Sequence, residues 1–134
     1  MDRDDVDRFE KLSGQLISIY EEISILSKKN PNDALNKFKL KFINDILVKC
    51  NDYLDVTYRP YEDFDQFEED DIPQNSDVVF ILSQYIQCFE KLRSDNVIMR
   101  HGNWHWRVIG NDGEEADSEG LVYIRTVKPK NLKD

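Results

Sequence analysis

The strongest constraint on the fold is an apolar seam close to the N-terminus. Within residues 3–28, apolar side chains recur at alternating steps of three and four: Phe9, Leu12, Leu16, Ile19, Ile23 and Leu26. This spacing places them on one face of an α-helix. Acids fill the first turn and Lys28 and Lys29 the last, which suits the helix dipole, and Asn30-Pro31 follows as a stop signal. The segment is therefore predicted to be a long amphipathic helix.

Two further helices are predicted before residue 97. The second begins near Asn32 or Asp33 and runs to about Leu54. Its apolar face consists of Leu35, Phe38, Phe42, Ile43, Ile46, Leu47, Cys50, Tyr53 and Leu54. The third has Ser76 as its expected N-cap and ends at residues 94–96. Its heptad-like seam is Val78, Leu82, Tyr85, Phe89 and Leu92. The short first connection makes the first two helices antiparallel neighbours.

The C-terminal third has the pattern of β-strands. Residues 97–101, 104–109 and 121–127 are rich in β-branched and aromatic side chains, and a polar, glycine-bounded loop at 110–120 separates the last two. We expect this loop to be mobile. Along the middle strand, alternation puts Trp104, Trp106 and Val108 on one face and His105, Arg107 and Ile109 on the other.

These elements predict an α+β fold that is mainly helical. A three-helix bundle is followed by a small C-terminal antiparallel β hairpin or sheet. The 134 residues suit a single domain, 1–134, because a chain of this length buries enough surface to hold a core. Its helical part covers 1–96 with an acidic connection at 55–75, its β part covers 97–127, and a loose tail is expected at 128–134.

The negative charge of the chain is concentrated in one stretch. Residues 59–77 carry eight acids against Arg59 alone, which accounts for −7 of the net charge of −9. Within it, YRPYEDFDQFEEDD repeats an aromatic ring every third residue, at Tyr58, Tyr61, Phe64 and Phe67. In an extended or 3₁₀ chain this period aligns the rings on one side. We therefore expect the rings to face the bundle and the acids to face solvent.

This acidic stretch is the predicted site of function. A fold has no structural need for such charge density, because crowded like charges repel one another. Its natural complement is a basic surface on another protein. The expected contact residues are Glu62, Asp63, Asp65, Glu68, Glu69, Asp70 and Asp71. We expect binding without catalysis or cofactor, as in an inhibitor, immunity or accessory protein. Direct nucleic-acid binding is not expected, since it needs clustered Lys and Arg.

Two other functions remain open on the sequence. A structural subunit of an assembly would pack through its helical seams, or through the strand that carries Trp104 and Trp106 as possible binding residues. The tryptophans are interpreted chiefly as a cover over one end of the helical core. A hydrolase or metal-dependent enzyme would use His101, His105 or a loop carboxylate, but no third metal ligand or nucleophile motif accompanies them.

The remaining features indicate the cellular environment. The N-terminus is charged from its second residue, which is not typical of a secretory signal. The longest uncharged run, residues 78–89, is too short to span a membrane. Cys50 and Cys88 lie in apolar helical patterns without a CxxC motif, which indicates reduced cysteines. A cytoplasmic protein is expected, and the sequence assigns it no oligomeric state.

Overall fold

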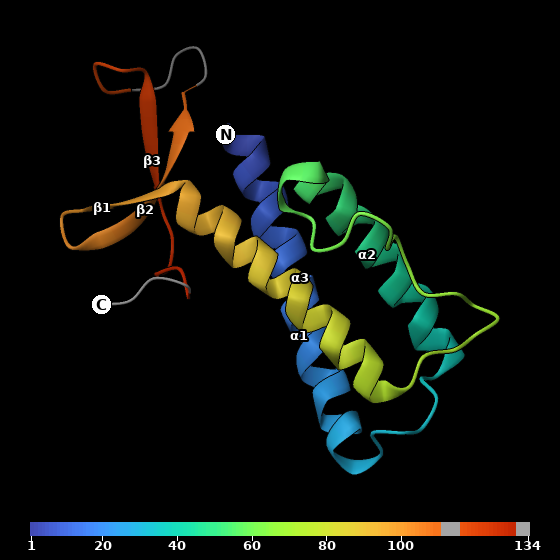
Figure 1. The fold of residues 1–134 in the computed structure, drawn as a ribbon. Coiled ribbons are helices and arrows are strands. Elements are labelled where there is room, and N and C mark those ends of the chain that lie inside the picture. The colour runs from blue at the N-terminus through green and yellow to red at the C-terminus, as the bar shows by residue number, and fades with distance from the viewer. Residues whose placement is uncertain (111–115, 131–134) are drawn as a thin grey trace.

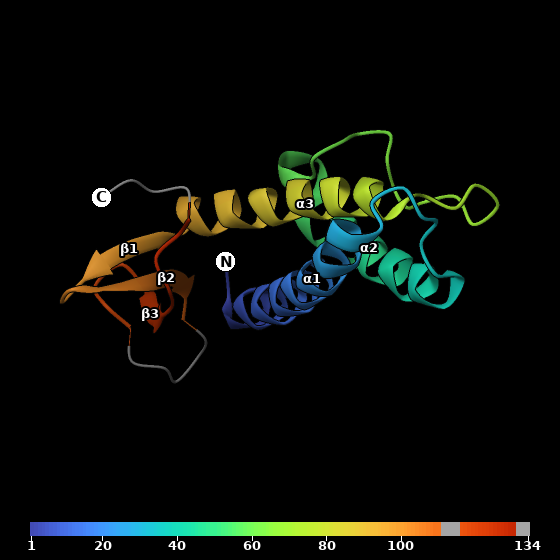
Figure 2. The same ribbon diagram turned by 90° about the horizontal axis from the view of Figure 1, so that it is seen from below.

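The fold is α+β and mainly helical, as predicted (Figure 1). The computed structural model describes residues 1–110 and 116–130. Its elements are α1 (Arg3–Lys29), α2 (Lys37–Tyr58), α3 (Asn75–Asp95), β1 (Val97–Arg100), β2 (Asn103–Ile109) and β3 (Leu121–Arg125). The three strands form one antiparallel sheet in the order β1-β2-β3. The sheet lies at one end of the helices, beside the N-terminus (Figures 1 and 2).

Helix α1 begins and ends close to the predicted positions. Its N-terminus carries a capping box, in which the side chain of Asp2 accepts from the backbone of Asp5 at 2.8 Å and that of Asp5 accepts from the backbone of Asp2 at 3.0 Å. Asn30 closes the other end by donating its backbone N–H to Leu26. Local sequence signals therefore set both ends of this helix.

Helix α2 begins later than the predicted Asn32 or Asp33. Asn36 is its N-cap, and the Asn36 side-chain oxygen accepts from the backbone N–H groups of Phe38 and Lys39. The residues before it pair instead with a distant segment, since the N–H of Leu35 donates to the carbonyl of Pro73 at 2.9 Å. The prediction was wrong here because a tertiary pairing replaced the first helical turn.

The far end of α2 and the start of α3 also differ from the prediction. Helix α2 continues past Leu54 to Tyr58, through a kink at Asp55, where φ is 55°. Helix α3 begins at Asn75 with Gln74 as its N-cap, so the expected cap at Ser76 lies inside the first turn. The buried Asn75 side chain donates to the carbonyl of Asn30 at 2.9 Å, which ties α3 to the end of α1.

One hydrophobic core joins the helices to the sheet. From the helices it contains Val6, Phe9, Leu12, Leu16, Ile23, Leu40, Leu47, Leu54, Val78, Leu82, Tyr85 and Phe89, and from the sheet Val97, Trp106 and Val108. The Trp106 ring lies 4.8 Å from that of Phe9, and its indole N–H donates to Glu10 at 3.0 Å. The large buried rings therefore attach the sheet to α1.

The strand register separates two faces of the sheet. Trp106 pairs with Val97 on β1 and with Ile124 on β3. These side chains therefore share the face toward the helices, together with the buried Val108. His105 and Arg107 lie on the opposite face, as predicted from the alternation along β2.

The chain after β3 is attached to the bundle over its first residues. The N–H of Thr126 donates to the carbonyl of Trp104 at 2.9 Å, Pro129 is buried, and the N–H of Lys130 donates to Glu90 at 3.1 Å. Residues 128–130, expected to belong to a loose tail, are therefore fixed. Residues 131–134 of that tail and residues 111–115 of the loop expected to be mobile lie outside the described part.

Candidate functional site

The acidic connection lies across the helical bundle. We name residues 59–74, which join α2 to α3, the acidic strap. It runs back along α2 and reaches the start of α3, at the end of the molecule away from the sheet (Figures 1 and 2). All seven acids that the sequence assigned to binding are exposed: Glu62, Asp63, Asp65, Glu68, Glu69, Asp70 and Asp71.

A buried asparagine of α2 holds the middle of the strap. The Asn44 side chain is 2% exposed. Its amide N–H donates to the carbonyl of Phe67 at 3.0 Å, and its amide oxygen accepts from the N–H of Phe67 at 2.9 Å. One side chain therefore satisfies both backbone groups of one strap residue, as a neighbouring β-strand would.

A second asparagine lies two helical turns further along the same face. The Asn51 amide N–H donates to the carbonyl of Asp65 at 3.0 Å and more weakly to that of Phe64 at 3.4 Å. Its oxygen accepts from the hydroxyl of Tyr85 on α3 at 2.6 Å. Burial raises the pKa of Tyr85 to about 12, so this hydroxyl stays protonated and able to donate. Asn51 therefore connects the strap to two helices.

Arg59 fixes the first bend of the strap. Its guanidinium donates to the carbonyl of Tyr61 at 3.0 Å and to that of Phe64 at 2.7 Å. The same group forms an ion pair with Asp65 at 2.9 Å. The guanidinium has five N–H donors in a rigid plane, so it can serve several acceptors of a tight bend at once.

Of the four rings expected to face the bundle, Tyr58 at the end of α2 and two of the strap do so. Phe64, Phe67 and Tyr58 pack against the hydrophobic core. Phe64 and Phe67 meet edge to face at 5.3 Å, and the Tyr58 hydroxyl donates to Asp95 at 2.7 Å. This bond raises the pKa of Tyr58, whereas bonds from Lys91 and then Tyr58 lower the pKa of Asp95. Tyr61 is half-buried without packing on this core.

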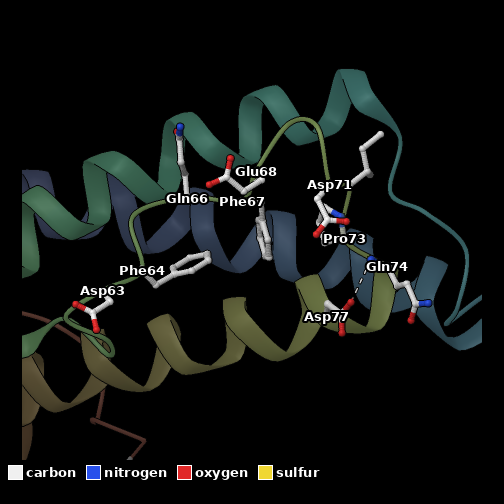
Figure 3. A pocket seen from close by; sticks show the side chains of 10 residues that line it. Asp63, Phe64, Gln66, Phe67, Glu68, Asp71, Pro73, Gln74 and Asp77 are labelled. Carbon is white, nitrogen blue, oxygen red and sulfur yellow. Dashed lines mark hydrogen bonds between the residues drawn. The ribbon is translucent and has the colours of Figure 1, made fainter.

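Beside these rings the strap borders a hollow of about 700 Å³ (Figure 3). Both carboxylates and apolar side chains line it. The lining includes Asp63, Glu68, Asp71 and Asp77, with Phe64, Phe67, Ile72 and Pro73. Figure 3 shows the Phe67 ring turned into the space between α2 and α3, while Asp63 and Glu68 point away from it. Acidic and apolar surface therefore occur side by side.

Few of these acids are neutralised within the chain. Asp65 is paired with Arg59. Glu69 and Asp70 border a smaller hollow of about 300 Å³ that Lys37 and Lys41 also line. No ion pair within 4 Å forms at Glu62, Asp63, Glu68 or Asp71 among residues 1–110 and 116–130. The strap therefore presents a largely uncompensated negative field to solvent.

The two tryptophans assigned as possible binding residues lie on β2. Trp106 is 0% exposed and offers no surface to a partner in this fold. Trp104 is half-buried beside the core. They cover the sheet end of the helical core, so the structure does not bring them together with the seven acids.

The histidines lie on the sheet. His101 is in the turn between β1 and β2 with φ of 52°, and the His105 ring nitrogen Nδ1 lies 3.0 Å from the carbonyl oxygen of Asn103. Within the described ranges, no three His, Cys, Asp or Glu side chains form a group that could hold a metal ion. Cys50 and Cys88 are free thiols, and burial raises the pKa of both.

Sequence reasoning missed Asn44 and Asn51, the residues that shape the site. The signal was present, because two asparagines seven residues apart interrupt the apolar face of α2 between Ile43 and Leu54. A buried polar side chain needs a hydrogen-bond partner. Such a pair therefore predicts a backbone segment lying across the helix, although not which one.

Comparisons with known proteins assign no family to this chain. No protein-family model matches it, and no curated protein or solved structure shows significant similarity. No helix among the described residues is long and apolar enough to cross a membrane. What can be said of function therefore depends on the geometry and charge of the chain itself.

Proposed function

We propose that this protein acts by binding, without catalysis, and that the acidic strap occupies a basic surface of a partner protein. An inhibitor, immunity or accessory protein of the cytoplasm acts in this way. The observation that carries the proposal is that the exposed acids stand on a backbone fixed by Asn44, Asn51 and Arg59.

A fixed backbone matters for affinity. A disordered acidic segment would lose conformational freedom on binding, which opposes association. Here the hydrogen bonds to the carbonyls of Phe64 and Phe67 have already ordered the chain. The carboxylates would attract a basic partner over distance, and that attraction weakens as salt rises. The hollow beside Phe67 would accept apolar parts of the partner's Lys or Arg side chains.

The alternative function is a structural subunit of an assembly. The helical seams give it little support, because Phe9, Leu16, Leu82 and Phe89 lie within the chain's own core. Its better support is on α2, where the Phe38 and Phe42 rings meet at 5.0 Å and are 71% and 50% exposed. An assembly that forms through α2 would lose affinity when Phe38 becomes Ser, and would tolerate loss of the strap acids.

A pull-down from native lysate at low and moderate salt tests the proposal. The variant changes Glu68, Glu69, Asp70 and Asp71 together to Ser. We expect the wild type to capture a basic protein at low salt and release it at moderate salt, and the variant to capture at least about tenfold less.

The matched control removes four acids elsewhere on the surface. It changes Asp7, Glu21, Asp45 and Glu119 to Ser, all exposed, so the net charge changes by the same amount. This control variant should capture the partner as well as the wild type does. Equal loss in both variants would show that net charge, and not the strap, attracts the partner. Equal capture by all three proteins would contradict the proposal.

A further inference from the structure

The sheet lies at the end of the molecule away from the start of α3 (Figure 2). It carries a second group of charged side chains, which are arginines. His105 pairs with Ile98 and Arg125, and Arg107 pairs with Tyr123. Side chains alternate along strands, so all these leave the face opposite the core, and the Arg107 guanidinium reaches the end of α3, where it donates to the carbonyl of Asp95 at 3.3 Å. We name this surface the arginine face: Ile98, Arg100, His105, Arg107, Tyr123 and Arg125.

The arginine face is partly pre-arranged. The Arg100 guanidinium, from β1, lies 3.8 Å from the ring centre of Tyr123 on β3. Because β1 and β3 are not neighbours, the sheet must curve around β2 to bring these groups together. The Tyr123 hydroxyl donates to Asp117 at 2.6 Å, which raises the pKa of Tyr123 and lowers that of Asp117.

The outer edge of strand β3 pairs with no other strand in the described part of the chain. Backbone bonds from Gly110 to Gly120 and from Thr126 to Trp104 show that even-numbered residues of β3 point their N–H and C=O groups at β2. The groups of odd-numbered residues therefore point outward. Those of Leu121 bond to Asp117, and among residues 1–110 and 116–130 no backbone group bonds to the N–H or C=O of Tyr123 and Arg125 on this edge.

We propose that the β3 edge and the arginine face together bind an extended acidic peptide segment of a second partner, as an added fourth strand. Its backbone would pair with Tyr123 and Arg125. Acidic side chains at alternate positions would reach Arg125, Arg107 and Arg100 on the face beside it. The site is distinct from the strap, and the proposal does not depend on the function proposed there.

The chemistry of the edge favours a peptide over other anions. Outward N–H and C=O groups need a strand-like backbone with matching acceptors and donors, which nucleic acid does not have. Arg100 covers one face of the Tyr123 ring, which leaves less of the ring for base stacking. The acidic strap of another copy is unsuited, because Asn44 and Asn51 already bond to its backbone.

Fluorescence anisotropy with a labelled peptide of alternating Glu and Thr tests this proposal. Arg125→Glu and Arg107→Glu should each weaken binding about tenfold. Lys49→Glu, which makes the same charge change on α2, should leave the affinity within about twofold. A peptide with N-methyl groups at alternate residues should bind about tenfold more weakly, because it cannot pair along the edge.

Chemical shifts locate the bound peptide. When the peptide is added to the wild-type protein, the backbone amide NMR signals of Tyr123 and Arg125 should shift more than those of other residues. Because Arg125 is exposed, its replacement should leave the fold intact. The urea concentration at the midpoint of unfolding checks this for each variant. Equal affinity of wild type and Arg125→Glu would overturn the proposal. So would tighter binding of a short oligothymidylate than of the peptide, which would assign the face to nucleic acid.

Discussion

The two charged surfaces of this protein are built in opposite ways. The arginine face stands on β-strands, whose own ladder fixes the distance between neighbouring side chains. The acidic strap has little regular secondary structure, and side chains from other elements, chiefly Asn44 and Asn51, hold its backbone. One surface is therefore organised by its own backbone and the other by its neighbours.

This difference predicts where mutations are costly. Charge on the arginine face contributes little to folding, because the backbone bonds beneath it persist when a side chain changes. The strap depends on buried amide groups, and removing one leaves one or two of its backbone groups without that partner. The contrast can be tested by three comparisons, from the largest expected effect to the smallest.

Replacement of Asn51 should have the largest effect on stability. Asn51→Leu removes the bonds to the carbonyls of Phe64 and Asp65 and leaves the buried Tyr85 hydroxyl without an acceptor. We expect a loss of about 3 kcal/mol in the free energy of unfolding. Arg125→Glu should change it by less than about 0.5 kcal/mol. Urea unfolding followed by circular dichroism measures both.

A double-mutant cycle identifies the source of that loss. If the unsatisfied hydroxyl contributes, Asn51→Leu should cost less in a Tyr85→Phe background. If Asn51→Leu lowers the free energy of unfolding equally in both backgrounds, the loss comes from the strap carbonyls alone. A loss no larger than that of Arg125→Glu would show that the strap is not held as we describe.

Two phenylalanines of unlike environment provide the second comparison. Phe67 packs on the core beneath the strap, whereas Phe38 is 71% exposed on α2. Phe67→Ala should lower the free energy of unfolding by about 2 kcal/mol, less than a fully buried ring would. Phe38→Ala should change it by less than about 0.5 kcal/mol.

Limited proteolysis should separate these variants as well. In Phe67→Ala, cleavage within residues 59–74 should become faster, because the strap leaves the bundle more often. In Phe38→Ala it should match the wild type. Unchanged cleavage in Phe67→Ala would mean that the asparagine bonds hold the strap without the ring.

The third comparison uses alkaline pH. Burial raises the pKa of Tyr85 to about 12, while an unfolded tyrosine ionises near 10. A folded pKa above the unfolded one gives stability that is complete below pH ~10 and is lost as pH rises toward 12. The urea midpoint should therefore fall between pH ~10 and ~12, and by less in Tyr85→Phe. An equal fall in both proteins would assign the effect to other groups.

Most of the architecture could be predicted from the sequence. Repeating apolar residues such as Phe9 and Leu16 determine a helix because the period belongs to the backbone geometry itself. The same holds for β2, where alternation alone separated Trp106 from Arg107. Predictions were less accurate at the start of α2, where the pairing of Leu35 with Pro73 replaces a helical turn.

The sequence by itself determined the helices, the strands and the concentration of acids at residues 62–71, because periodicity and charge are local properties of the chain. Only the tertiary structure decided that the strap lies along α2 and which side chains hold it there. That outcome depends on amide groups of Asn44 and Asn51 meeting carbonyls of residues at least 13 positions away. No local pattern specifies such a pairing, since its free energy arises only when the helices already stand side by side.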